Sequence, residues 1–433
     1  MKNSLIITIG GKKMKKICFF MATPFTLGGE QRVISNISSM LSNEGYDVTI
    51  LCTDMRIPRD NSIYNLDEKV KIDYLDGYNN KIVIKIREKR EKLKLENALT
   101  GKYKNNLFVL KQINCDTLTK FLLKRKIEKE KYDVVIGVGI YNLMLSRVSK
   151  SISAKTIGSQ HSSSIRYFEF KGEWYYNQEK YVKYMFNNLD EYVVLTNKDK
   201  EYIKEKFNKD VKVINNPKSI ISNEVTNLKN KNFLAVGRFV TVKNFLSLID
   251  MFNEFHKYNK DWKLNIVGAG ELKEEYIKKI KEYKLEKYIK IMDSTSEIEK
   301  YYLNSSIYLM SSIQEGWGMV IGEAIEFGLP VISFDITSAP EMIKDGYNGF
   351  IIENYNEQKY VEKMLYLANN SEKLKEFSKN SKIFSDSKSN DLITKKWINI
   401  FEEKYNAIEE NYNFDKLKIN FRKLRKVIKE YLF

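Results

Sequence analysis

Two carboxylates, Glu315 and Glu323, lie eight residues apart, the first in a glycine-rich turn and the second in the helical pattern that follows. The turn comes directly after an apolar run at Ile307–Met310, which predicts a strand. Gly316 and Gly318 leave backbone N–H groups approachable, and the N-terminus of a helix favours negative charge. The segment could therefore bind a diphosphate through its amides while the two carboxylates accept hydrogen bonds from sugar hydroxyls.

A second candidate anion site follows the apolar run 233–236, which also predicts a strand. Gly237 and Arg238 come at the end of this run, and Lys243 lies five residues beyond Arg238. Both cations would lie at the carboxyl end of a parallel strand, where open α/β sheets bind their ligands. Arginine can hold phosphate oxygens through two donors, and lysine adds a point charge. Taken alone, such a pair is more often solvated surface.

Two loops in the first half of the chain also carry candidate residues. Gly28 and Gly29 connect the first predicted strand to the first predicted helix and permit a ligand to approach the backbone closely. This loop is not the G-x-G-x-x-G fingerprint of dinucleotide binding, and the chain contains no G-x-x-x-x-G-K-[ST] loop. His161 follows the predicted strand Lys155–Ser159. A lone loop histidine is more often a plain hydrogen-bonding residue, but this one lies at the end of a strand.

Short apolar runs alternate with helical patterns along most of the chain, and these elements must position the loops. The predicted strands are 16–20, 47–52, 133–138, 155–159, 191–195, 211–214, 233–236, 264–267, 289–292, 307–310 and 331–334. Helical patterns between them include 31–43, 245–255 and 318–327. Repeated β-α-β units predict parallel sheets covered on both faces. Two such series, separated by Asn215-Asn216-Pro217, predict two doubly wound domains with a hinge near Pro217.

The composition bounds the class of protein. A chain of 433 residues with 43% hydrophobic and 30% charged residues is long enough for two globular domains. Three cysteines and two histidines exclude a disulfide scaffold and make a Cys/His zinc site close to excluded. No apolar run approaches the ~20 residues of a membrane-spanning helix, and no signal-peptide core precedes a cleavage site. We therefore expect a cytoplasmic protein.

The net charge of +17 predicts an anionic partner. Residues 81–94 carry seven basic and two acidic residues, as do residues 415–433, so ten of the seventeen charges lie in 33 residues. The segment 81–94 falls in a stretch, 54–131, where no strand is predicted, and both a solvated helical face and a contact with membrane or acceptor stay open. In 415–433 the apolar residues form a helical stripe, which suits an anionic membrane surface or packing on a domain.

In combination, these motifs resemble glycosyltransferase family 4, whose members are retaining enzymes of the GT-B fold. The matching segments are GGEQRV (28–33), EGYDVTIL (44–51), AVGRFVTVKN (235–244), VGAGE (267–271), QEGWGMVIGEAIEFGLPVI (314–332) and APEMIKDGYNGFII (339–352). The resemblance spans roughly residues 15–400 and fails for 54–131 and for the tail. It implies an α/β fold with two doubly wound Rossmann-like domains that face each other across a cleft, followed by a basic C-terminal helix.

The resemblance also implies domain boundaries. We predict a possible N-terminal extension (1–13), an acceptor domain (14–216), a nucleotide-sugar domain (217–390), a helix that crosses back to the first domain (391–410) and a basic amphipathic tail (411–433).

Roles follow from the same resemblance. Glu315 would contact the transferred sugar, and Glu323 the ribose hydroxyls of the nucleotide. Arg238 and Lys243 would neutralise the donor diphosphate, and His161, the loosest match, would lie at the acceptor side. We expect Glu315, Arg238, Lys243 and His161 to be catalytic. The other residues that would bind the nucleotide sugar are Gly28, Gly29, Gly237, Gly316, Trp317, Gly318, Met319, Val320 and Glu323.

The implied reaction moves a hexose from a nucleotide sugar, expected to be UDP-linked, to a lipid-linked or polysaccharide acceptor in bacterial cell-surface glycan synthesis. The anomeric configuration would be retained by front-face attack, in which the leaving phosphate takes the acceptor's proton, so Glu315 is not assigned as a nucleophile. We expect no cofactor and no metal, because the nucleotide sugar is a substrate. The basic segments predict a peripheral enzyme on the inner face of the cell membrane, with no nucleic-acid partner.

Two other classes of protein compete with this interpretation. A GT-B sugar-nucleotide epimerase would lack the paired glutamates as they stand here. A nucleic-acid-binding protein would explain the net charge, but the sequence contains no recognisable nucleic-acid module. Loss of activity on a preserved fold conflicts with the intact motifs. Release of nucleoside diphosphate from a nucleotide sugar separates the transferase from these alternatives.

Overall fold

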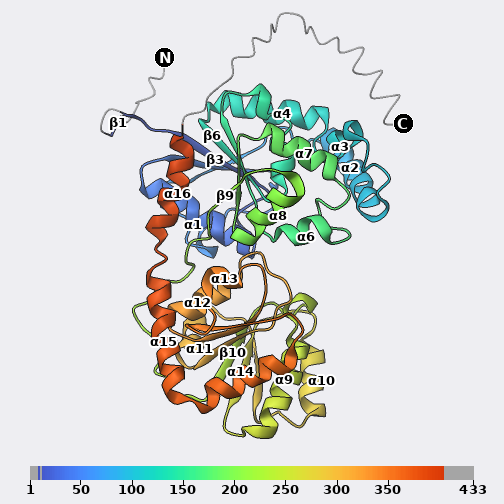
Figure 1. Cartoon of the computed structure of the whole chain (residues 1–433). Coiled ribbons are helices and arrows are strands. Elements are labelled where there is room, and N and C mark those ends of the chain that lie inside the picture. The colour runs from blue at the N-terminus through green and yellow to red at the C-terminus, as the bar shows by residue number, and fades with distance from the viewer. Residues whose placement is uncertain (1–7, 10–11, 404–433) are drawn as a thin grey trace, which may run out of the picture. The chain divides into compact units, whose positions relative to one another are not determined.

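The computed structural model describes residues 8–9 and 12–403, and within them the chain forms two α/β domains (Figure 1). The seven described strands of the first sheet are all parallel and lie in the order β5-β4-β3-β6-β7-β8-β9. They are β3 (Lys16–Met21), β4 (Asp47–Cys52), β5 (Lys71–Tyr74), β6 (Val134–Val138), β7 (Lys155–Ser159), β8 (Glu191–Val194) and β9 (Lys212–Val213). A separate antiparallel pair, β1 (Thr8–Ile9) and β2 (Lys12–Lys13), precedes them.

The second sheet is built on the same plan. Its six described strands are parallel and lie in the order β12-β11-β10-β13-β14-β15. They are β10 (Asn232–Val236), β11 (Lys263–Val267), β12 (Ile289–Met292), β13 (Ile307–Met310), β14 (Val331–Phe334) and β15 (Gly349–Ile352). In each sheet the strand order reverses at one point, between β3 and β6 and between β10 and β13. The loops that follow the strands at such a point lie side by side and are where doubly wound sheets bind ligands.

Helices connect the strands and cover the sheets (Figure 1). In the first domain they are α1 (Gly29–Asn43), α2 (Lys81–Thr100), α3 (Leu107–Asn114), α4 (Thr117–Glu130), α5 (Tyr141–Leu145), α6 (Ser164–Glu169), α7 (Glu179–Asn188) and α8 (Asn197–Phe207). In the second domain they are α9 (Phe245–Tyr258), α10 (Lys273–Glu282), α11 (Ile298–Leu303), α12 (Met319–Glu326), α13 (Ala339–Met342), α14 (Glu357–Asn369) and α15 (Ser371–Asp386). Short 3₁₀ turns are η1 (Asn61–Ile63), η2 (Ser149–Ser151) and η3 (Thr241–Lys243).

The central strands are apolar on both faces because helices cover both. In β3, Cys18 and Phe20 belong to one hydrophobic core, whereas Phe19 and Met21 belong to the core on the opposite face. All four side chains are fully buried. Successive side chains of a strand point to opposite faces, so a continuous apolar run is what a strand between two helical layers requires. The predicted α/β class with two doubly wound domains is confirmed.

Two strands were not predicted from the sequence. β5 lies in the stretch 54–131, where no strand was expected, and its residues Lys71-Ile72-Asp73-Tyr74 are partly or fully exposed at the edge of the sheet. An edge strand that is not covered on both faces has no apolar run to reveal it. β15 begins with Gly349, and the space there requires a glycine, since a Cβ at this position would lie 2.2 Å from the carbonyl oxygen of Val331.

The last described helix, α16 (Asn390–Glu402), packs on the first domain, although it follows α15 of the second (Figure 1). Trp397 contacts Phe19 of β3 edge to face, with 6.5 Å between ring centroids. Phe401 contacts Tyr46 in the same manner at 6.0 Å. The chain thus passes between the domains twice within the described residues, once through the hinge and once between α15 and α16. The predicted basic tail 411–433 lies outside the described residues.

The basic segment 81–94 forms the first part of α2. Val83 and Arg90 are buried against the domain, whereas the cations Lys81, Lys85 and Lys92 are exposed. No helix among the described residues is long and apolar enough to cross a membrane. The three cysteines are buried and form no disulfide.

Candidate active site

The loops after β10 and β13 meet because these two strands are neighbours in the second sheet. The backbone N–H of Ile313 donates to the carbonyl oxygen of Val242 (3.2 Å), and the Ser311 hydroxyl donates to the carbonyl oxygen of Lys243 (2.9 Å). These bonds hold the glycine-rich turn of the β13 loop against the η3 turn of the β10 loop. Both candidate anion sites of the sequence are therefore parts of one site.

Lys243 and Glu315 are bonded to each other across this junction. The ammonium group of Lys243 donates to Oε1 of Glu315, and the Ser312 hydroxyl donates to the same oxygen at 2.9 Å. The side chains of Lys243 and Glu315 are only 13% and 16% exposed. Charged hydrogen bonds between half-desolvated groups are strong. The contact fixes the position of a cation and a carboxylate beside the N-terminus of α12.

Glycines make room for this arrangement. Gly318 precedes α12 with a φ of 66°, which favours glycine. A Cβ at Gly268 would lie 1.9 Å from the carbonyl oxygen of Gly237, so these two loops touch through their backbones. A Cβ at Gly237 would lie 3.0 Å from Cε of Lys243. The segment after β10 therefore confines the lysine side chain that reaches Glu315.

Arg238 lies in the same β10 loop but is placed differently. Its side chain is exposed, and among the described residues no hydrogen bond or ion pair to it is recorded. The structure thus brings Lys243 to the paired glutamates and leaves the Arg238 guanidinium open to solvent at the carboxyl end of β10.

Glu323, in the first half of α12, is 5% exposed and accepts three hydrogen bonds. The donors are Nη1 of Arg32 (2.9 Å), the hydroxyl of Ser219 (2.7 Å) and the hydroxyl of Tyr302 (2.8 Å). Burial and the nearby Glu323 charge raise the pKa of Tyr302 well above its ordinary value, so this hydroxyl stays a donor. The second glutamate of the pair therefore joins α12 to the hinge and to the first domain.

The Gly28–Gly29 loop of the first domain lies at the same place. The Tyr64 hydroxyl bonds to both the N–H (2.7 Å) and the carbonyl oxygen (3.1 Å) of Gly28. A Cβ at Gly29 would lie 3.7 Å from the sulfur of Met319, the first residue of α12. Arg32 follows in the first turn of α1. The sequence contained this arginine within the GGEQRV motif, but no role was predicted for it.

His161 also reaches the paired-glutamate segment. A Cβ at Gly316 would lie 2.7 Å from the carbonyl oxygen of His161. The His161 Nε2 atom hydrogen-bonds with the Ser159 hydroxyl at 2.9 Å, and Nδ1 is buried without a partner among the described residues. Burial lowers the pKa of this imidazole to about 4, so it is neutral at pH 7. The loop after β7 therefore presents an uncharged histidine beside Glu315.

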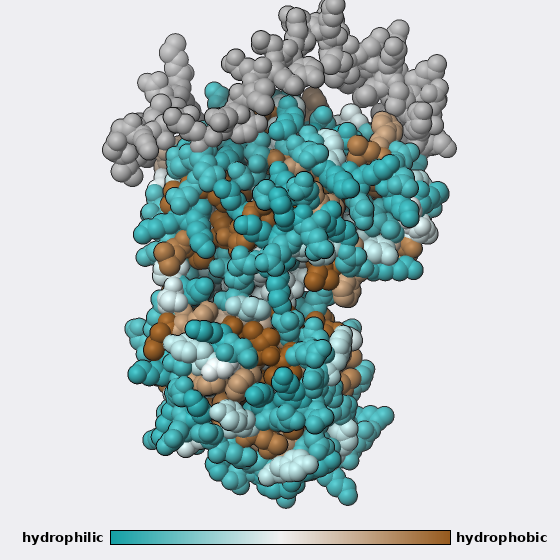
Figure 2. All heavy atoms as spheres, in the orientation of Figure 1, coloured by the Kyte–Doolittle hydropathy of each residue, from teal (hydrophilic) through white to brown (hydrophobic). Residues whose placement is uncertain are grey.

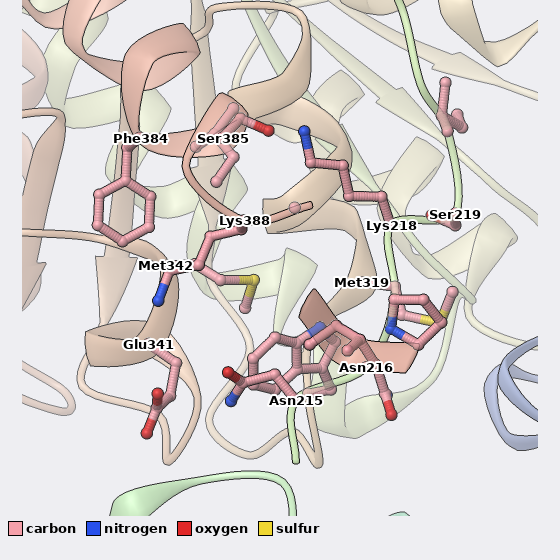
Figure 3. Close-up of a pocket in the computed structure, with 16 residues that line it drawn as sticks. Asn215, Asn216, Lys218, Ser219, Met319, Glu341, Met342, Phe384, Ser385 and Lys388 are labelled. Atoms are coloured by element: carbon pink, nitrogen blue, oxygen red, sulfur yellow. The ribbon is translucent and has the colours of Figure 1, made fainter. Parts of the chain in front are cut away.

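Trp317, Met319 and Val320 are half-buried. Met319 packs on the first domain's core, whereas Trp317 and Val320 pack on the core of the second. Figure 3 shows a pocket that Trp317 and Met319 line together with the hinge residues 215–220 and residues of α13 and α15. Neither Glu315 nor Glu323 lines this pocket. It lies at the hinge beside the site.

No group of three or more His, Cys, Asp or Glu side chains that could hold a metal ion occurs in the part of the chain that the structure describes. The chemistry available at the site is thus that of a lysine, two carboxylates, backbone amides of a helix N-terminus and hydroxyl groups. Such a set can bind a polyhydroxylated, phosphorylated ligand.

Two family models match consecutive parts of the chain. The model described as Glycosyltransferase Family 4 matches residues 27–217, and the model described as Glycosyl transferases group 1 matches residues 218–384. The boundary between them falls at the hinge.

Individual proteins are similar over nearly the whole length. An uncharacterized glycosyltransferase of Haemophilus influenzae is 28% identical over 388 residues, which cover 89% of this chain and 99% of the relative. The amylovoran biosynthesis glycosyltransferase AmsD of Erwinia amylovora is 29% identical over 385 residues, covering 86% of this chain and 95% of the relative. A crystal structure of Staphylococcus aureus TarM in complex with fondaparinux, alpha-GlcNAc-glycerol and UDP has a TM-score of 0.67 and 19% identity, covering 90% of this chain and all of that one.

Proposed function

Because the chain belongs to the glycosyltransferases, with a family 4 first half and a group 1 second half, we propose that it transfers a hexose from a nucleotide sugar to a glycan acceptor with retention of configuration. The observation that carries this proposal is the junction of the β10 and β13 loops. There Lys243 is bonded to Glu315, beside the N-terminus of the helix that carries Glu323. A cation for phosphate and two carboxylates for hydroxyls are the groups that a nucleotide sugar needs.

In the proposed reaction the donor diphosphate lies between Lys243, Arg238 and the N-terminal amides of α12. The bond between the anomeric carbon and the diphosphate oxygen breaks, the acceptor oxygen bonds to the same face, and the acceptor's proton passes to the departing phosphate. Lys243 and the α12 amides stabilise the charge that develops on the leaving group. Glu315 orients the transferred sugar, and Glu323 accepts hydrogen bonds from the ribose. No metal or further cofactor takes part in this proposal.

The proposed acceptor is a lipid-linked or polysaccharide glycan of the bacterial cell surface, and the proposed donor carries UDP. AmsD, by its name, acts in amylovoran biosynthesis, and the similar TarM structure contains UDP. The proposal places the protein in the same class of biosynthesis.

The test is a panel of purified donors. We expect the full-length protein to release nucleoside diphosphate from at least one UDP-sugar among UDP-glucose, UDP-galactose and UDP-N-acetylglucosamine, with GDP-mannose as a base control. An NMR spectrum of the product taken before mutarotation should show the donor's anomeric configuration. Absence of release from every donor would overturn the proposal, and interconversion of the sugar without release would favour an epimerase.

We also propose peripheral attachment to an anionic membrane surface. On the face seen in Figure 2 hydrophilic residues cover most of both domains, with smaller hydrophobic patches between them. On α2, the exposed apolar residues Ile82 and Leu95 lie on the same helix as the exposed lysines of 81–94. Nearby cations are also crowded, since burial and the Arg147 guanidinium lower the pKa of Lys111. Exposed cations with scattered apolar residues suit an anionic bilayer.

Flotation with liposomes tests the attachment. We expect the full chain to float with vesicles containing phosphatidylglycerol and to stay behind with pure phosphatidylcholine. Replacing Lys81, Lys85 and Lys92 by Glu should reduce flotation, whereas the same exchange at Lys278 and Lys287 of the second domain should not. A chain ending at residue 414 measures the share of the tail. Equal flotation by all four proteins would reject both basic segments as the contact.

A further inference from the structure

Glu30 and Arg32, in the first turn of α1, reach different parts of the molecule. Arg32 bonds to Glu323 of the second domain. Glu30 instead lies against the loop after β6, where a Cβ at Gly139 would be 2.5 Å from its Oε2 atom. β3 and β6 are neighbours at the point where the first sheet reverses its strand order, so the α1 start and Gly139 occupy the first domain's expected ligand position.

The Glu30 carboxylate has no partner in the described part of the chain. No hydrogen bond or ion pair to it is recorded, although the residue is half-buried. Burial raises its pKa to about 7. A desolvated carboxylate without donors costs free energy in the folded state, so such groups are rare outside ligand sites.

A second polar group without a partner lies at the same spot. The Tyr167 hydroxyl oxygen would be 3.6 Å from a Cβ at Gly139, and no hydrogen bond to this hydroxyl is recorded among the described residues. Two neighbouring tyrosines are already engaged, since Tyr141 bonds to the Thr53 hydroxyl (2.7 Å) and Tyr175 donates to the carbonyl oxygen of Gly139 (3.1 Å). Glu30 and Tyr167 are therefore the open acceptor and donor of a tyrosine-lined recess.

This recess adjoins the segment assigned to the donor sugar. Gly29, next to Glu30, lies against Met319, and the carbonyl oxygen of His161 lies against Gly316. A molecule bound at Glu30 would thus approach from the first-domain side.

We propose that Glu30 and Tyr167, with Gly139 leaving the room between them, form a subsite for an uncharged, hydroxylated sugar of the acceptor. This inference rests on the proposed function. Glu30 accepts a hydrogen bond from an acceptor hydroxyl, and the Tyr167 hydroxyl donates to a ring or hydroxyl oxygen. No lysine or arginine is recorded as pairing with Glu30, so a phosphate or uronate at this position would meet an uncompensated negative charge. The subsite therefore selects acceptors whose terminal residue is neutral.

The test uses the full chain, a UDP-sugar that it hydrolyses, and octyl glycosides as acceptor probes. We expect transfer to uncharged octyl hexosides or N-acetylhexosaminides and at least tenfold less to their 6-phosphates. In Glu30→Gln the ratio of transfer to hydrolysis should fall about tenfold, the size expected for a hydrogen bond to a charged group. Tyr167→Phe should lower it less, and Glu44→Gln, at the exposed far end of α1, should leave it as in the wild type.

The pH dependence gives an independent reading. The groups that face Glu30 are Tyr141, Tyr167 and Tyr175, and burial raises the pKa of each further above neutrality, so none of them titrates near pH 7. The KM for the octyl glycoside should rise below pH 7 in the wild type and stay flat in Glu30→Gln.

The outcomes separate the two proposals. If the wild type hydrolyses no donor, the proposed function fails. If it hydrolyses donor but uses no uncharged glycoside, prefers the 6-phosphates, or behaves alike with Gln at position 30, the subsite is wrong while the proposed function stands.

Discussion

Arg32 of α1 and Glu323 of α12 are 291 residues apart in the chain and form an ion pair of 2.9 Å between the two domains. Arg32 also donates to the carbonyl oxygen of Ser219 in the hinge (3.3 Å). One arginine thus connects the glycine loop of the first domain, the hinge and the helix that carries the second glutamate. A nucleotide ribose that bonds to Glu323 must share this carboxylate with Arg32 or replace it.

Loss of this arginine should cost stability. In Arg32→Met the buried Glu323 charge keeps only two hydroxyl donors, so we expect the thermal midpoint to fall by about 2–4 °C, as for a loss near 1 kcal/mol. The side chain of Arg32 is 31% exposed, which moderates the effect. The matched control is Arg56→Met, whose partner Asp54 lies on the surface with Arg56 82% exposed. Equal midpoints for both variants would contradict the assigned role.

The Lys243–Glu315 contact should be needed for turnover. We expect Glu315→Ala and Lys243→Ala each to lower kcat/KM by a factor equivalent to at least about 2 kcal/mol of transition-state stabilisation. Lys273→Ala serves as a control, because Lys273 pairs with the exposed Asp293 in the same domain. Donor hydrolysis measures all three. Turnover near the wild-type rate in either site variant would remove these residues from the mechanism.

Two glycines eight residues or fewer from Glu315 make a matched pair. A Cβ at Gly316 would lie 2.7 Å from the His161 carbonyl oxygen and 2.9 Å from the Cα of Ser162, so Gly316→Ala must displace backbone of one domain or the other. At Gly322 within α12 the nearest atom would be the Met342 sulfur at 3.7 Å, an ordinary contact. We expect Gly316→Ala to lose at least tenfold in kcat/KM, whereas Gly322→Ala should raise the thermal midpoint slightly, since alanine favours a helix by about 1 kcal/mol. A Gly316→Ala protein as active as Gly322→Ala would show that the loop has room to spare.

Glu326 should make the stability pH-dependent. This carboxylate of α12 is 1% exposed and accepts from Lys218 (2.6 Å), Lys382 (2.8 Å) and Ser385 (2.6 Å). Burial alone would raise its pKa, but these hydrogen bonds outweigh burial and lower the pKa to about 2, below the ordinary 4.5. A lowered pKa in the folded state gives stability that is complete above pH 4.5 and is lost as the pH falls toward 2.

The measurement is the thermal midpoint between pH 3 and pH 7. At pH 7 we expect Glu326→Gln to unfold at a lower temperature than the wild type, and this gap should narrow as the pH falls. The exposed Glu353 on the same domain is the control for a lost carboxylate. A gap that is constant with pH would mean that the charge of Glu326 does not hold the hinge residue Lys218 to α12.

Local sequence was sufficient for most of the strands. β3, β6 and β13 are covered on both faces, so burial forces their residues to be apolar and the run is visible in the sequence. β5 escaped prediction because an exposed edge strand is under no such constraint. The glycines and charged residues of the site were also visible, since each follows a strand and lies where a doubly wound sheet binds ligands.

The sequence by itself determined that two doubly wound domains are joined near Pro217, and that Lys243, Glu315 and Glu323 lie in loops or helices after strands. Only the tertiary structure decided their partners. Lys243 meets Glu315 because β10 lies beside β13, and Glu30 meets Gly139 because β3 lies beside β6. A pattern of apolar residues records whether a strand is buried, but not which strand lies next to it. Strand order, set by the packing of the whole domain, therefore brings together side chains that no local motif connects.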